Sequence, residues 1–139
     1  MNKKIWVTVL ALCFVLCLGI QPCLASASEV VPYASDVIDY TSLTFTSSNG
    51  KVYADAHIAT TDRATKIGFK SVTIYHKVNG VWSVAASVSG KYSSGTDEYT
   101  CSVSCNLVSG REYKASCSSY AVVDGKSDTG SASVSPTTF

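Results

Sequence analysis

Residues 43–58 read LTFTSSNGKVYADAHI. Apolar and polar residues alternate on both sides of Asn49-Gly50, which is the period of two that is typical of β-strands with one buried face. Asn-Gly favours a two-residue hairpin turn, because both turn residues need a positive φ. Such a turn places Phe45 opposite Ala54, and residues directly opposite in an antiparallel pair share a face. This stretch therefore predicts a hairpin that packs one side against a core.

A second hairpin is expected around Asn79-Gly80. A two-residue loop there would put Trp82 and Val84 on the face away from Ile74. A three-residue loop, 78–80, places Ile74 opposite Val84 instead, and burying a large apolar side chain contributes roughly 1.5–3 kcal/mol. We therefore expect the three-residue loop, with Trp82 and Ile74 on the same inner face.

The rest of the chain continues the pattern. A two-residue loop at Asp124-Gly125 would place Cys117 opposite Ala132, and residues 99–107 alternate apolar and polar side chains. Together the segments predict an all-β fold, a seven-stranded antiparallel β-sandwich. One sheet would hold strands 39–47, 51–60 and 99–107, and the other sheet would hold the second and third hairpins.

The first residues have the three parts of a secretory signal peptide: Lys3 and Lys4, an apolar run at 5–20, and the small residues Ala25-Ser26-Ala27. We expect cleavage near Ala27-Ser28, which makes the protein secreted and leaves no membrane span after processing. The expected division is a signal peptide at 1–27, an N-terminal extension at 28–38, the β-sandwich at 39–136 and a tail at 137–139.

The charge balance is close to neutral, with 11 Lys+Arg against 10 Asp+Glu and a formal net charge of +1. A nucleic-acid-binding domain usually carries a strong excess of positive charge. We therefore expect no nucleic-acid partner.

One short motif resembles a known family. Leu107, Gly110 and Tyr113 match the L-x-P-G-x-x-Y signature of fibronectin type III domains, although Ser109 stands where that family has proline. The resemblance implies an immunoglobulin-like sandwich in which the hydroxyl of Tyr113 hydrogen-bonds to the preceding loop, a tyrosine corner. The motif indicates the fold and implies no activity.

A wider pattern covers most of the chain after residue 27 and consists of Gly50-Lys51-Val52, Ile67-Gly68, residues 72–75, Trp82, Gly110 and Tyr113. The spacing of these residues is similar to that of a family of small secreted proteins of Gram-positive bacteria. This resemblance implies an extracellular location and a single sandwich domain, and again no activity.

Three cysteines remain after the expected cleavage, and an extracellular setting favours disulfides. Cys101 and Cys105 share a face but lie four residues apart on one strand, roughly 13 Å, which is too far for a bond. Folding the next strand back brings Cys117 level with Cys101. We expect a Cys101–Cys117 disulfide between the sheets, with Cys105–Cys117 as the alternative.

Residues that could carry chemistry are sparse. His57 and Asp55 share an outward face, but a metal or acid–base site needs a third group that the sequence does not supply. We therefore expect no enzyme activity, no cofactor and no metal.

The sequence favours a monomeric, secreted, non-catalytic interaction module with an unknown extracellular protein or glycan as its partner. Tyr53, Tyr75 and Tyr120 have outward parity and are candidates for a contact surface, although scattered surface tyrosines explain them as well. The alternative function is a secreted antagonistic factor, either bacteriocin-like or inhibitory.

Overall fold

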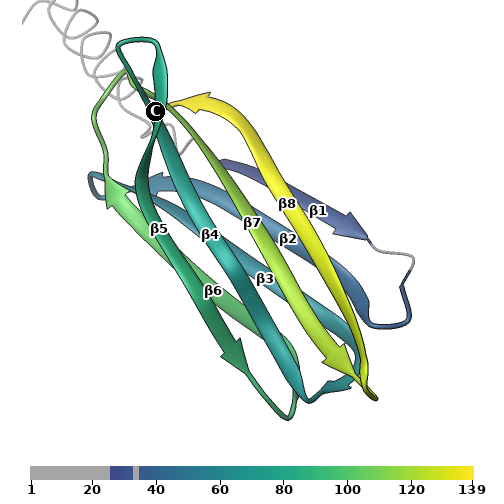
Figure 1. Cartoon of the computed structure of the whole chain (residues 1–139). Coiled ribbons are helices and arrows are strands. Elements are labelled where there is room, and N and C mark those ends of the chain that lie inside the picture. The colour runs from purple at the N-terminus through teal and green to yellow at the C-terminus, as the bar shows by residue number, and fades with distance from the viewer. Residues whose placement is uncertain (1–25, 33–34) are drawn as a thin grey trace, which may run out of the picture.

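The computed structural model describes residues 26–32 and 35–139, and these residues form two antiparallel sheets packed face to face as a sandwich (Figure 1). The predicted all-β sandwich is confirmed, with eight strands rather than seven. The described residues contain no helix long and apolar enough to cross a membrane. The strands are β1 (Ser26–Pro32), β2 (Ile38–Ser48), β3 (Lys51–Ala64), β4 (Lys66–Val78), β5 (Val81–Ser93), β6 (Thr96–Asn106), β7 (Glu112–Val123) and β8 (Lys126–Thr138).

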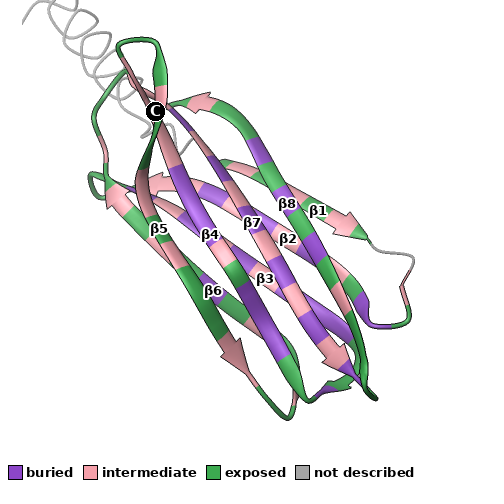
Figure 2. Cartoon of the chain, viewed as in Figure 1, coloured by how far each residue is buried: buried purple, intermediate pink, exposed green. Residues whose placement is uncertain are grey.

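The strand order is β1-β2-β3-β6 in one sheet and β5-β4-β7-β8 in the other. The placement of β2, β3 and β6 together, opposite the second and third hairpins, is as the sequence predicts. Along the central strands, buried side chains alternate with partly or fully exposed ones, and the buried side chains form the core between the layers (Figure 2). The largest fully buried side chains are Tyr113, Phe45, Phe69, Ile38, Leu43, Ile58, Ile67 and Ile74.

The first hairpin has the predicted register. Phe45 lies opposite Ala54, and both side chains are fully buried. The turn residues Asn49 and Gly50 have φ values of 50° and 71°, so both occupy the left-handed region that a two-residue turn of this type requires. The alternation and the turn therefore agree, and each fixes the same pairing.

The third hairpin and the strand before it also follow the prediction. Cys117 lies opposite Ala132 across a two-residue turn at Asp124-Gly125. In β6, Cys101 is buried while its neighbours Thr100 and Ser102 are exposed, as expected from their parity. Because β6 is the edge strand of its sheet, its inward side chains are less deeply buried than those of β3.

The predicted register of the second hairpin is wrong. Asn79 and Gly80 form a two-residue turn, with φ values of 51° and 78°, and Val78 pairs with Val81. Trp82 therefore lies opposite Lys77 on the outer face, away from the buried Ile74. A β-bulge between Ile74 and Tyr75 then shifts the register by one residue, so that side chains farther along β5, such as Val88 opposite Val72, face the core. The preference of Asn-Gly for a two-residue turn set the length of the loop. The bulge accommodates the extra residue of β5 within the strand pairing.

Both ends of the described chain join the sandwich. β1 pairs with β2 from Ser26 to Pro32, so residues 28–32 of the segment expected as an extension form a strand. The carboxylate of Glu29 accepts a hydrogen bond from the backbone N–H of Ser133, which satisfies one donor at the edge of β8. At the other end, the ring of Phe139 packs against Phe45, with 5.4 Å between ring centroids. The expected signal peptide falls largely on residues 1–25, which lie outside the described residues.

Tyr113 has the contacts that the fibronectin-like motif implies. Its hydroxyl accepts a hydrogen bond from the backbone N–H of Val108 at 2.9 Å and donates to the carbonyl of Asn106 at 3.4 Å. Tyr113 is fully buried. The hydroxyl therefore ties the β6–β7 loop to the core, without the proline that the motif usually has at Ser109.

Candidate interaction surface

The outer face of the β5-β4-β7-β8 sheet carries lysine and aromatic side chains in two clusters. The Trp82 cluster consists of Tyr75, Lys77, Trp82 and Lys114. The Tyr120 cluster consists of Lys66, Lys70, Tyr92 and Tyr120. We call the surface that holds both clusters the basic-aromatic face.

The Trp82 cluster follows from the two-residue turn at Asn79-Gly80, which sends Trp82 outward. The ammonium group of Lys114 lies 4.5 Å from the ring centroid of Trp82 and 5.4 Å from that of Tyr75. Lys77 lies 5.7 Å from Trp82 and forms an ion pair with Glu112 at 2.7 Å. These cation–π contacts hold the ammonium groups near the surface rather than extended into solvent.

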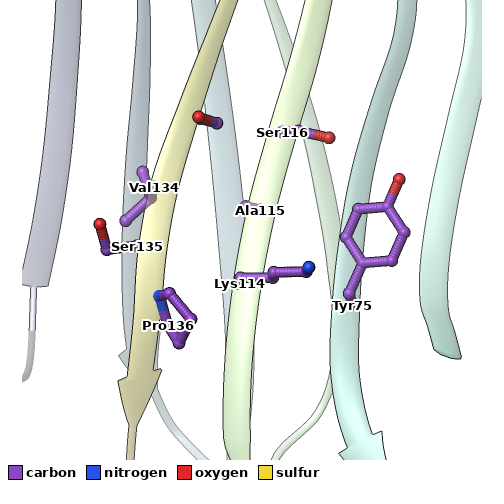
Figure 3. A pocket seen from close by; sticks show the side chains of 8 residues that line it. Tyr75, Lys114, Ala115, Ser116, Val134, Ser135 and Pro136 are labelled. Atoms are coloured by element: carbon purple, nitrogen blue, oxygen red, sulfur yellow. The ribbon is translucent and has the colours of Figure 1, made fainter. Parts of the chain in front are cut away.

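A hollow of about 480 Å³ adjoins this cluster on β4, β7 and β8 (Figure 3). Lys114 extends from β7 toward Tyr75 on β4, and Pro136 flanks the hollow from β8. Hydroxyl groups contribute much of the lining. The hydroxyl-bearing residues are Tyr75, Ser116, Ser133 and Ser135.

The Tyr120 cluster lies toward the other end of the same face. Lys66 places its ammonium group 4.3 Å from the ring centroid of Tyr92 and 5.6 Å from that of Tyr120. The two rings are edge to face, with 6.3 Å between centroids. Lys70 lies 5.3 Å from Tyr120 and donates a hydrogen bond to the hydroxyl of Thr129 at 3.1 Å.

Serine and threonine residues occupy the face between the clusters. They form cross-strand pairs, of which Thr73 and Ser87 share a hydrogen bond of 2.8 Å. Each of these pairs between β5 and β4 continues with a serine on β7 and a serine on β8, so two rows of hydroxyl-bearing residues cross all four strands of the sheet. The residues are Ser71, Thr73, Ser87, Ser89, Ser116, Ser118, Ser131 and Ser133.

The two outer faces of the sandwich differ in charge. Within residues 26–32 and 35–139, Lys66, Lys70 and Lys114 have no carboxylate within ion-pair distance. The outer face of the β1-β2-β3-β6 sheet instead carries Asp55 and Glu98. A nearly neutral chain therefore presents a positive face on one sheet and acidic groups on the other.

The tyrosines singled out from the sequence do not form one surface. Tyr75 and Tyr120 lie on the basic-aromatic face, one in each cluster, whereas Tyr53 lies on the other sheet, paired with Thr46 and Ser104. Sequence analysis missed Trp82 as a surface residue, because it placed that ring in the core. The Asn-Gly turn, taken alone, is the signal that would have placed it outward.

The structure adds neighbours to His57 but no enclosed site. Its Nδ1 lies 3.1 Å from the hydroxyl of Tyr40, and its Nε2 lies 3.8 Å from an oxygen of Glu98. Asp55 accepts a hydrogen bond from Ser102 at 2.5 Å instead. Glu98 is 66% exposed, so water competes for this contact. In the described part of the chain, no group of three His, Cys, Asp or Glu residues could hold a metal ion.

The predicted Cys101–Cys117 disulfide is not present. Cys101, Cys105 and Cys117 are free thiols, and no Cα atom of β6 lies within 8 Å of a Cα atom of β7. A disulfide needs Cα atoms about 4.4–6.8 Å apart, whereas facing sheets are separated by about 10 Å. The alternative Cys105–Cys117 pair fails for the same reason. Both thiols of the expected bridge do face the core, but from opposite layers.

Burial also makes the thiol of Cys117 hard to ionise. Desolvation raises its pKa from 9.0 to about 11, against a lowering effect of the backbone hydrogen bond at Ala132; Glu29 and Cys101 raise it further. Desolvation likewise raises the pKa of Cys101 and of Cys105. Because the thiolate is the reactive form, Cys117 has the chemistry of a small apolar core residue.

Comparisons with protein-family models, with curated proteins and with solved structures found no match. Function is therefore inferred from the chemistry of the basic-aromatic face.

Proposed function

We propose that this chain is a secreted, non-catalytic interaction module that binds an extracellular partner through the basic-aromatic face. The observation that carries the proposal is the Trp82 cluster: Trp82 and Tyr75 stand on the outer face around Lys114, beside a hollow of about 480 Å³.

An outward tryptophan supports binding for an energetic reason. Trp82 is half-buried, and its neighbour Val84 is 58% exposed on the same strand. Leaving large apolar surface in water costs free energy that a covering partner would recover, at about 25 cal/mol per Å². Tryptophan, tyrosine and other aromatic residues are enriched where protein surfaces make their strongest contacts.

The scaffold beneath the face is suited to holding it in place. The inward residues of β4 and β7, such as Val72, Ile74 and Ala115, are buried, so the strands that carry Tyr75 and Lys114 are fixed from below. Side chains on strands are positioned more closely than those on loops. The surface is therefore formed before any partner arrives, which lowers the entropic cost of binding.

The test is retention of the purified protein by the cells that produce it and by their extracellular material. Labelled residues 28–139 should be retained, and the variant Trp82→Ala/Lys114→Gln should be lost to the wash. A matched variant on the other sheet, Tyr53→Ala/Asp55→Asn, should be retained like the wild type. Equal retention of both variants, or no retention of the wild type, would overturn the proposal.

Export is tested separately by the mass of the protein in the culture medium. We expect a chain that begins at Ser28, as the signal-peptide pattern predicts. Full-length protein that stays inside the cells would contradict the extracellular part of the proposal.

A further inference from the structure

We propose that the partner of the basic-aromatic face is an acidic polysaccharide, a sugar chain that carries carboxylate, sulfate or phosphate groups. This inference rests on the proposed function, because it names the class of partner for the same face. Four features support it: the unneutralised lysines, the hydroxyl-lined hollow, the distance between the clusters, and the opposite charge of the other sheet.

The lysines select for negative charge. Lys66 and Lys114 hold their ammonium groups 4.3 Å and 4.5 Å from the rings of Tyr92 and Trp82, with no carboxylate within ion-pair distance among the described residues. An anion that approaches either group therefore meets a positive charge already fixed in place. Such positioned charges attract anionic ligands in a way that weakens with added salt.

The surroundings of these lysines suit a sugar. The hollow beside Lys114 is lined by the hydroxyls of Tyr75, Ser116 and Ser133, which can both donate and accept hydrogen bonds. Sugar hydroxyls need such two-way partners, and the apolar C–H faces of a sugar ring pack on aromatic rings. The Trp82 cluster supplies both kinds of contact within one site.

The spacing of the clusters favours an extended chain over a small anion. Lys114 and Tyr120 belong to different clusters and lie six residues apart on β7, which corresponds to roughly 20 Å along the strand. Hydroxyls of Ser116 and Ser118 continue the surface between them. A single small ion would contact one cluster only, whereas a sugar polymer can lie along the strand and contact both.

The other face of the sandwich argues against a nucleic acid or an anionic membrane. Asp55 and Glu98 lie on the β1-β2-β3-β6 sheet together with Lys51, so this nearly neutral molecule carries acidic groups opposite the basic-aromatic face rather than positive charge on both sheets. Tight nucleic-acid binding normally draws on many phosphate contacts and a strong positive field. An oligonucleotide is therefore the competing probe in the experiment.

The experiment uses dextran and carboxymethyl-dextran, which share a sugar backbone and differ in charge. Trp82 is the sole tryptophan of residues 28–139, so its fluorescence reports directly on the proposed site. We expect a change of emission with carboxymethyl-dextran that weakens as salt is added, and none with dextran. Lys114→Gln should lower the affinity about fivefold, as expected for one exposed charge contact. Lys66→Gln should act similarly, and Lys51→Gln, on the other sheet, should bind like the wild type.

Three outcomes would overturn the inference: equal binding of both dextrans, tighter binding of oligo(dT) or polyglutamate than of carboxymethyl-dextran, or an equal loss in Lys51→Gln and Lys114→Gln. Each variant is first shown to unfold cooperatively like the wild type. If neither dextran binds but the producing cells still retain the protein through Trp82 and Lys114, the proposed function stands and the polysaccharide inference fails.

Discussion

A buried hydrogen bond between the two sheets offers the sharpest test of the packing. The hydroxyls of Thr41 on β2 and Ser119 on β7 lie 2.7 Å apart, and both residues are fully buried. Each hydroxyl is the hydrogen-bond partner of the other between the two sheets. Replacing one of them alone leaves the other without a partner, which costs about 1–3 kcal/mol.

The perturbation is a double-mutant cycle with Ser119→Ala, Thr41→Val and the combined variant. Each single change is expected to lower the free energy of unfolding by about 1–3 kcal/mol, because a polar group stays buried and unpaired. The double variant removes both polar groups, and we expect it within about 1 kcal/mol of the wild type. The costs of the single changes are therefore strongly non-additive.

The assay is urea unfolding of residues 28–139 followed by far-UV circular dichroism, with the slope against urea checked for each variant. Single variants that cost less than about 0.5 kcal/mol, or costs that add in the double variant, would refute this account of the core. Ser116→Ala is a suitable control, because Ser116 lies in the outer hollow of the same strand.

Three further predictions concern single residues. Gly68→Ala should destabilise the fold by more than about 2 kcal/mol in the same urea assay, because φ is +156° and a Cβ would lie 2.8 Å from the Cα of Tyr92 on β5. Cys117 should resist alkylation at neutral pH in the folded protein. Its pKa rises from 9.0 to about 11 on folding, so the contribution of Cys117 to the free energy of unfolding, measured against Cys117→Ala, should be constant below pH 9.0 and fall toward pH 11; a contribution that grows over this range would contradict the prediction. Tyr113→Phe should cost about 1 kcal/mol through loss of its hydrogen bond to Val108, measured by thermal unfolding.

Much of the fold could be predicted because the deciding signals are local. Phe45 and Ala54 face each other because alternation and the Asn49-Gly50 turn each require that register. The same agreement holds for Cys117 and Ala132. At Trp82 the two signals disagreed, since burial favoured one loop length and turn chemistry another. Weighing burial above the turn gave the wrong face, because a bulge farther along the strand returns Val88 to a position opposite the buried Val72 while Trp82 and Val84 stay on the outer face.

The candidate surface could be predicted only in fragments. Tyr75 and Tyr120 have outward parity and lie in hairpins that the sequence assigns to one sheet, but parity does not show which side chains of different strands come into contact. Lys114 meets Trp82 although they lie on different strands that are not hydrogen-bonded to each other, with β4 between them. The expected Cys101–Cys117 disulfide was wrong for a related reason. Strand parity predicts that both cysteines face inward, but it does not give the distance between the two sheets.

The sequence alone determined the alternation of faces and the positions of the three hairpin turns, with the loop length correct at Asn49-Gly50 and Asp124-Gly125, because strand parity and positive φ are properties of neighbouring residues. Only the tertiary structure decided the position of the bulges, the joining of β1 to the sheet, and the gathering of lysines and aromatic rings on one face. These features depend on how strands distant in the chain align, and one residue of slippage in that alignment moves a side chain from the core to the surface.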